Sequence, residues 1–132
     1  MGILDVIGAA IATFAFGAVW YMMLAKPWTE AAAIPTDAKG RPLNSGNPVP
    51  YLVSFVMILL VAGMMRHVFA LSGIDTLGKG AVSGLGIGAF FISPWLILTN
   101  FYEDRPLNLS LINAGYAIFG CAIMGACLIL FA

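Results

Sequence analysis

The sequence is poor in charged residues. Asp, Glu, Lys and Arg make up 9% of the 132 residues, and the formal net charge is zero. A soluble domain carries about 25% charged residues, so this chain cannot cover a surface that faces water. We therefore expect lipid to be its solvent and the lipid bilayer to be a partner. No run of basic residues is present, which argues against nucleic acid as a partner.

Histidine and cysteine are also scarce. The single histidine, His67, leaves no ligand set for a tetrahedral zinc ion or for a haem with two axial ligands. Cys121 and Cys127 lie in one predicted helix with diverging side chains, so we expect them to pack as apolar residues without forming a disulfide. The sequence therefore predicts no metal and no cofactor.

No carboxylate is predicted at the middle of the membrane. Asp5 lies at the edge of the first apolar segment, and Asp75 belongs to a loop. A proton-coupled pump needs an ionisable group at that depth, so the sequence argues against a small multidrug exporter despite the similar size.

The chain does contain four long apolar segments. They cover residues 3–24, 51–71, 77–98 and 107–131, approximately, and each is long enough to cross about 30 Å of hydrocarbon. The sequence therefore predicts an all-α, integral membrane four-helix bundle with antiparallel transmembrane helices, forming a single domain over residues 1–132. The short loop 72–78 predicts that the second and third helices pack as neighbours.

The segments between the helices are polar on one side of the predicted membrane. A long, turn-rich loop covers residues 26–49, within which residues 28–33 can form a short surface helix. All three tryptophans and all four tyrosines fall toward this side. Basic residues favour it by four to two, with Arg66 on the other side expected to reach the lipid headgroups. We predict an integral membrane protein whose polar loops face the cytoplasm.

Small residues recur at helical spacing in the last two helices. The third predicted helix carries Gly80, Gly84 and Gly88, and the fourth carries Ala117, Cys121 and Gly125. Such stripes allow close approach of helices, either within the bundle or between subunits. We therefore expect a homo-oligomer or a contact with another membrane protein. Pro94 predicts a kink or a loosened turn, with Ser93 satisfying part of the lost hydrogen bonding.

The polar side chains concentrate in residues 99–116. Glu103, Asp104 and Arg105 either bind a metal or substrate or form a solvated loop with a local ion pair. Asn113 lies about two turns into the fourth helix, where an unpaired amide is costly. We expect it to bond to Arg105, Tyr21 or a carbonyl that Pro94 leaves free. The predicted ligand-binding residues are Trp20, Tyr21, Asn100, Glu103, Arg105, Asn113 and Tyr116.

The chain resembles the small bacterial membrane proteins grouped as domain of unknown function 1761. The resemblance covers nearly the full chain and rests on Gly17, Trp20, Tyr21, Lys26, Trp28, Thr99, Asn100, Glu103, Arg105, Pro106, Leu107 and the run from Leu111 to Tyr116. Members of that family often have a histidine after this tyrosine, whereas the present chain has Ala117. The resemblance implies four membrane helices in a bacterial inner membrane and implies no activity.

Three kinds of function are compatible with these features. The interpretation we favour is a non-enzymatic binding or accessory protein with a polar, aromatic-rimmed pocket at one membrane face. A minimal transporter or channel formed by a homo-oligomer is the alternative, although no ionisable residues line a route beyond Asn113. An enzyme acting on lipid through Glu103 or Asp104 would need a nucleophile or a metal constellation that the sequence does not display.

Overall fold

The computed structural model describes residues 3–43 and 46–132. Met1, Gly2 and two residues of the predicted long loop, Asn44 and Ser45, lie outside the described residues. The helices are α1 (Leu4–Met23), α2 (Ala25–Ala31), α3 (Val49–Ser72), α4 (Leu77–Ile87), the π-helical turn η1 (Gly88–Ile92), α5 (Ser93–Tyr102) and α6 (Leu107–Leu130). The described residues contain no strand, only one isolated bridge between Thr36 and Pro42. The all-α prediction is confirmed.

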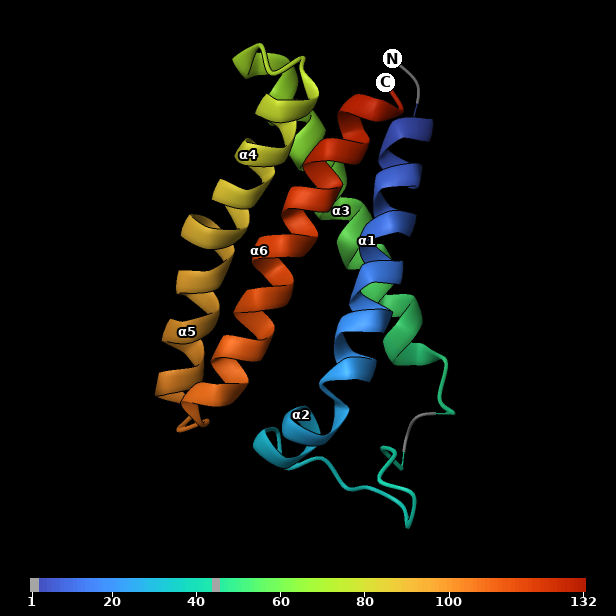
Figure 1. Ribbon diagram of the computed structural model, residues 1–132, viewed down its shortest axis with the longest axis vertical. Helices are drawn as coiled ribbons and strands as arrows, with labels where there is room; N and C mark the ends of the chain where they lie inside the picture. The colour runs from blue at the N-terminus through green and yellow to red at the C-terminus, as the bar shows by residue number, and fades with distance from the viewer. Residues whose placement is uncertain (1–2, 44–45) are drawn as a thin grey trace.

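Four helical segments are long and apolar enough to cross a membrane. They are α1, α3, the continuous segment from Leu77 to Tyr102, and α6. The end of α6, the start of α1 and the turn between α3 and α4 lie at one end of the molecule, whereas α2 and the turn between α5 and α6 lie at the other (Figure 1). Many large apolar side chains on these helices are exposed, as expected for helices in contact with lipid.

Helix α6 is the central element of the bundle. It contacts α1, α2, α3, α4, η1 and α5, and it lies between α1 on one side and the α4–α5 segment on the other (Figure 1). The main buried cluster is formed by α1, α3 and α6 around Phe69, Met124 and Leu128. These residues lie near the ends of α3 and α6, so the apolar core is concentrated at the end of the molecule where the chain terminates.

The contact between α4 and α6 is made backbone to backbone. A Cβ atom added at Gly84 would collide with the carbonyl of Cys121, and one at Gly88 would collide with the carbonyl of Ala117. On the other side, a Cβ at Gly125 would meet the carbonyl of Gly80. The two predicted small-residue stripes therefore face each other within one chain. Self-association would have to use a different surface.

The turn before Pro94 is loosened rather than sharply broken. The backbone N–H of Ser93 donates to the carbonyl of Gly88, five residues earlier, which is the hydrogen bond of a π-helix. The wider turn accommodates the missing donor of Pro94. The prediction that Ser93 compensates locally is wrong, because its hydroxyl donates to the carbonyl of Ala114 on α6 at 3.3 Å.

Arg66 forms an ion pair inside the protein. Its Nε donates to Oδ2 of Asp5 at 2.7 Å, and only 2% of the Asp5 side chain is exposed. The other carboxylate oxygen accepts from the N–H of Val6. Arg66 therefore has a partner within the protein that the sequence did not predict, a nearly buried carboxylate one helix away. This pair connects the start of α1 to α3.

Two further expectations differ from the structure. Helices α3 and α4 follow one another across a short turn, yet α3 makes its main contacts with α1 and α6. The third span also continues to Tyr102, beyond the predicted end near residue 98. Thr99 and Asn100 are helical: the hydroxyl of Thr99 donates to carbonyls of the preceding turn, and the amide of Asn100 donates to Ser110 on α6.

Replacing Gly84 with alanine should destabilise the protein by about 1–3 kcal/mol, because the added methyl group overpacks a backbone contact. Gly86 in the same helix is the matched control, since a Cβ there meets nothing within 4 Å. Gly86→Ala should be neutral or stabilising, because alanine has the higher helix propensity. Reversible unfolding in detergent measures both changes. Equal effects would contradict the assigned α4–α6 contact.

Replacing Asp5 with asparagine should lower the free energy of unfolding by about 3 kcal/mol, the lower end of the range for breaking a buried ion pair. Arg66→Met should have a similar effect, because Asp5 then remains charged without its partner. The double variant Asp5→Asn/Arg66→Met should be less destabilised than the two single losses added together. A double-mutant cycle in the same detergent measures this coupling, and strict additivity would show that the two residues do not interact.

Candidate functional site

An open polar groove lies at the end of the molecule that carries α2. Its volume is about 460 Å³. Four predicted ligand-binding residues line it: Asn100, Glu103, Arg105 and Asn113. The remaining lining residues come from α2, from the segment after it and from α6, and they are Trp28, Ala32, Ile34 and Leu109. We refer to this concavity as the polar groove.

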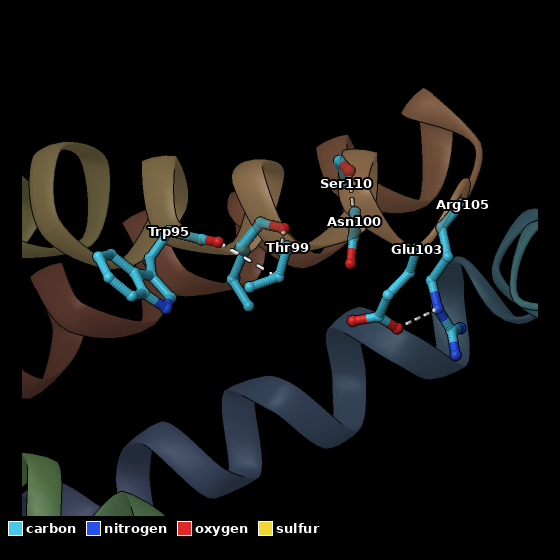
Figure 2. A network of polar contacts seen from close by, with 7 residues as sticks. Trp95, Thr99, Asn100, Glu103, Arg105 and Ser110 are labelled. Atoms are coloured by element: carbon cyan, nitrogen blue, oxygen red, sulfur yellow. Dashed lines mark hydrogen bonds and ion pairs between the residues drawn. The ribbon is translucent and has the colours of Figure 1, made fainter.

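The charged residues of the polar groove form a local ion pair. The Nε of Arg105 donates to Oε1 of Glu103 at 3.1 Å, and about half of each side chain is exposed. Figure 2 shows the pair at the end of α5, with Arg105 in the turn that leads to α6. A pair this exposed adds little stability. Because it uses only Nε of Arg105, the terminal amino groups have no partner among the described residues.

Asn100 contributes a buried amide to the groove. Its Nδ2 donates to Oγ of Ser110 on α6 at 2.9 Å, and the residue is only 8% exposed. Its carbonyl oxygen points away from Ser110, to the side of α5 on which Glu103 lies (Figure 2). Within the described part of the chain this oxygen accepts no hydrogen bond. Asn100 thus presents an unpaired acceptor to the groove.

Asn113 is held by Tyr21. The Tyr21 hydroxyl donates to Oδ1 of Asn113 at 2.7 Å, which identifies one of the three expected partners. The amide nitrogen of Asn113 has no partner among the described residues and therefore remains a donor. The ring of Tyr21 also packs edge-on against Trp28, with centroids 5.2 Å apart, so α1 and α2 together position this wall of the groove.

Three predicted site residues, Trp20, Tyr21 and Tyr116, do not line the polar groove. The indole N–H of Trp20 donates to the carbonyl of Ile112 at 3.0 Å, and the hydroxyl of Tyr116 donates to the carbonyl of Thr13 at 3.2 Å. The rings of Tyr21 and Tyr116 pack edge-on at 5.5 Å. These aromatic residues join α1 to α6, the helix that carries Leu109 and Asn113 of the groove.

Sequence reasoning did not assign Ser110 or Trp28 to the site. Ser110 gave no signal, because only the turn between α5 and α6 brings it opposite Asn100. Trp28 follows the first span by a few residues, and its neighbouring aromatics could have indicated a role. Asp104 lies in the same turn with a positive φ of 54° and is not among the lining residues.

The groove combines hydrogen-bond donors and acceptors. Arg105 and Asn113 supply donors, and Glu103 and Asn100 supply acceptors. Among the residues that the structure describes, no three His, Cys, Asp or Glu side chains come together as a metal site would require. The donors and acceptors that line the groove can form hydrogen bonds with a polar group.

Four apolar helices of membrane length with a polar groove at one end define a small helical protein of the integral membrane class. The chain belongs to a family described as protein of unknown function (DUF1761), whose profile matches residues 4–129. The expected family membership is thereby confirmed. No curated protein and no solved structure is significantly similar to the chain.

Tyr21→Phe should lower the free energy of unfolding by about 1–3 kcal/mol, because it leaves Oδ1 of Asn113 without its donor. Tyr102→Phe is the matched control, since that residue is 86% exposed and its hydroxyl can bond to water. Denaturation in detergent, followed by circular dichroism, compares the two variants with the unmodified protein. If Tyr102→Phe lowered the free energy of unfolding as much as Tyr21→Phe, the loss could not be attributed to the hydrogen bond between Tyr21 and Asn113.

Proposed function

We propose that this protein is a non-enzymatic binding or accessory protein of the bacterial inner membrane, and that the polar groove holds its ligand. The observation that carries the proposal is the set of unpaired hydrogen-bonding groups in the groove. The carbonyl oxygen of Asn100, the amide nitrogen of Asn113 and the terminal amino groups of Arg105 all lack partners among the described residues. None of these atoms is buried without a partner, so they are accessible at the groove and available to bond to a ligand.

The proposed membrane arrangement is an antiparallel bundle with the groove on the cytoplasmic side. The positions of the turns in Figure 1 support antiparallel spans. The preference of Lys26, Lys39, Arg41 and Arg105 for the groove side supports the orientation. The exposed apolar faces of α3 and of the α4–α5 segment remain available for lipid, for a second copy or for another membrane protein.

A minimal transporter is the second candidate, and the π-helical turn beside Pro94 favours it. Such turns often mark functional positions in helices, and this one could allow α5 to move relative to α4. A movement of α4 itself would break its backbone contact with α6, so binding is the simpler role. Solute flux in liposomes containing the purified protein tests transport, and activity lost in Pro94→Ala would favour this candidate over binding.

Arg105→Ala should reduce the amount of lipid or other ligand that copurifies with the folded protein about tenfold, the loss expected when one charged hydrogen bond is removed. Asn113→Ala should also reduce it. Arg41→Ala and Asn108→Ala are the matched controls, because both residues are exposed and do not line the groove. Native mass spectrometry gives the ligand bound per protein. If neither groove variant changed this ratio, the proposed role would be lost.

A further inference from the structure

From the donors and acceptors in the polar groove we infer that its ligand is a zwitterion combining a primary ammonium with a phosphate, as in the headgroup of phosphatidylethanolamine. This inference rests on the proposed binding function and specifies its ligand. The inference rests on the two halves of the groove. One half offers only acceptors, and the other offers only donors.

The acceptor half consists of Asn100 and Glu103. Asn100 is only 8% exposed, but its carbonyl oxygen is accessible at the groove, and no described residue donates to it. The second carboxylate oxygen of Glu103 is also without a partner in the described chain. A primary ammonium carries three donors and no acceptor, so it matches these two oxygens.

The donor half consists of Arg105 and Asn113. Arg105 lines the groove and engages Glu103 through Nε, so its terminal amino groups have no partner in the described chain. Asn113 accepts from Tyr21 through Oδ1 and leaves its Nδ2 available. Guanidinium and amide N–H groups match the oxygens of a phosphate, which only accepts hydrogen bonds when ionised. The two charges of the headgroup thus each face the opposite charge of the protein.

The same arrangement disfavours other common headgroups. An anionic headgroup such as that of phosphatidylglycerol would place its charge beside Glu103, and its hydroxyl groups would offer Asn100 only uncharged donors in place of an ammonium. A choline headgroup has no N–H group, so the acceptor on Asn100 would be desolvated and left unpaired. Quaternary ammonium groups are recognised by aromatic cages, whereas the groove has a single tryptophan, Trp28, in its lining.

The surface next to the groove indicates that the headgroup is that of a lipid. Trp95, Thr99 and Glu103 recur at intervals of four residues and project to the same side of α5 (Figure 2). Trp95 is 70% exposed and, at 1.5 Å of rise per residue, lies about 12 Å deeper in the membrane than Glu103. An acyl chain attached to a headgroup in the groove can therefore follow α5 into the hydrocarbon layer.

The experiment measures lipid retention by the full-length protein. The protein is purified in detergent, mixed with equal amounts of phosphatidylethanolamine, phosphatidylcholine and phosphatidylglycerol carrying the same acyl chains, and analysed by native mass spectrometry. We expect phosphatidylethanolamine to be retained about tenfold over the other two, the difference that about 1.4 kcal/mol produces. Stepwise N-methylation of the headgroup should lower retention progressively. Equal retention of the ethanolamine and choline lipids would overturn the inference.

Matched variants separate recognition from folding. Asn100→Ala should abolish the preference, whereas Ser110→Ala removes the same bond between α5 and α6 but keeps the carbonyl oxygen of Asn100, so the preference should survive. Glu103→Gln should weaken the preference, and Glu30→Gln on the exposed side of α2 should not. An equal loss of preference in Asn100→Ala and Ser110→Ala, with both proteins folded, would overturn the inference.

Two further results separate the lipid inference from the binding function on which it rests. Soluble glycerophosphoethanolamine should compete only weakly, and competition as strong as that of the lipid would overturn the lipid source. The protein could retain all three lipids equally and retain less of each in Arg105→Ala. That result would overturn the ligand assignment and leave the binding function in place. Retention insensitive to every groove variant would overturn both.

Discussion

The close contact between α4 and α6 is the constraint on which the rest of the structure depends. Glycine backbones of α4 lie directly on carbonyl groups of α6, with no side chains between them. Contact of this kind favours association in lipid, where no hydrophobic effect drives helices together and packing must supply the stability. It also leaves α6 in the middle of the bundle, in contact with every other described helix.

The polar groove is a consequence of that central position. Because α4 and α5 are joined through the π-helical turn, fixing α4 on α6 places α5 beside the start of α6, where Asn100 meets Ser110. On the other side of α6, Tyr21 of α1 holds Asn113 and contacts Trp28 of α2. The groove lies between these two attachments. Its polar groups are therefore positioned by helices, while only Arg105 and its partner belong to the turn.

The two ends of the bundle are stabilised by different interactions. At the end where the chain terminates, an apolar cluster and the nearly buried pair of Asp5 and Arg66 join α1, α3 and α6. At the groove end, neutral hydrogen bonds and aromatic contacts join α1, α2, α5 and α6. Neutral groups cost less to desolvate than charges, so neutral groups left without a partner at the groove end cost less stability than charged ones would.

The sequence by itself determined the helical class and the four membrane segments, because apolar runs of this length and composition have few alternatives in lipid. It also determined that Gly80, Gly84 and Gly88 would approach another helix, and that Asn113 would need a partner. Only the tertiary structure decided that α6 is the helix that these glycines contact and that Tyr21 is the partner of Asn113. The facing small-residue stripes, the pair of Asp5 with Arg66 and the contact of Asn100 with Ser110 join residues from different helices, and spacing along one helix defines a face without saying what lies opposite it.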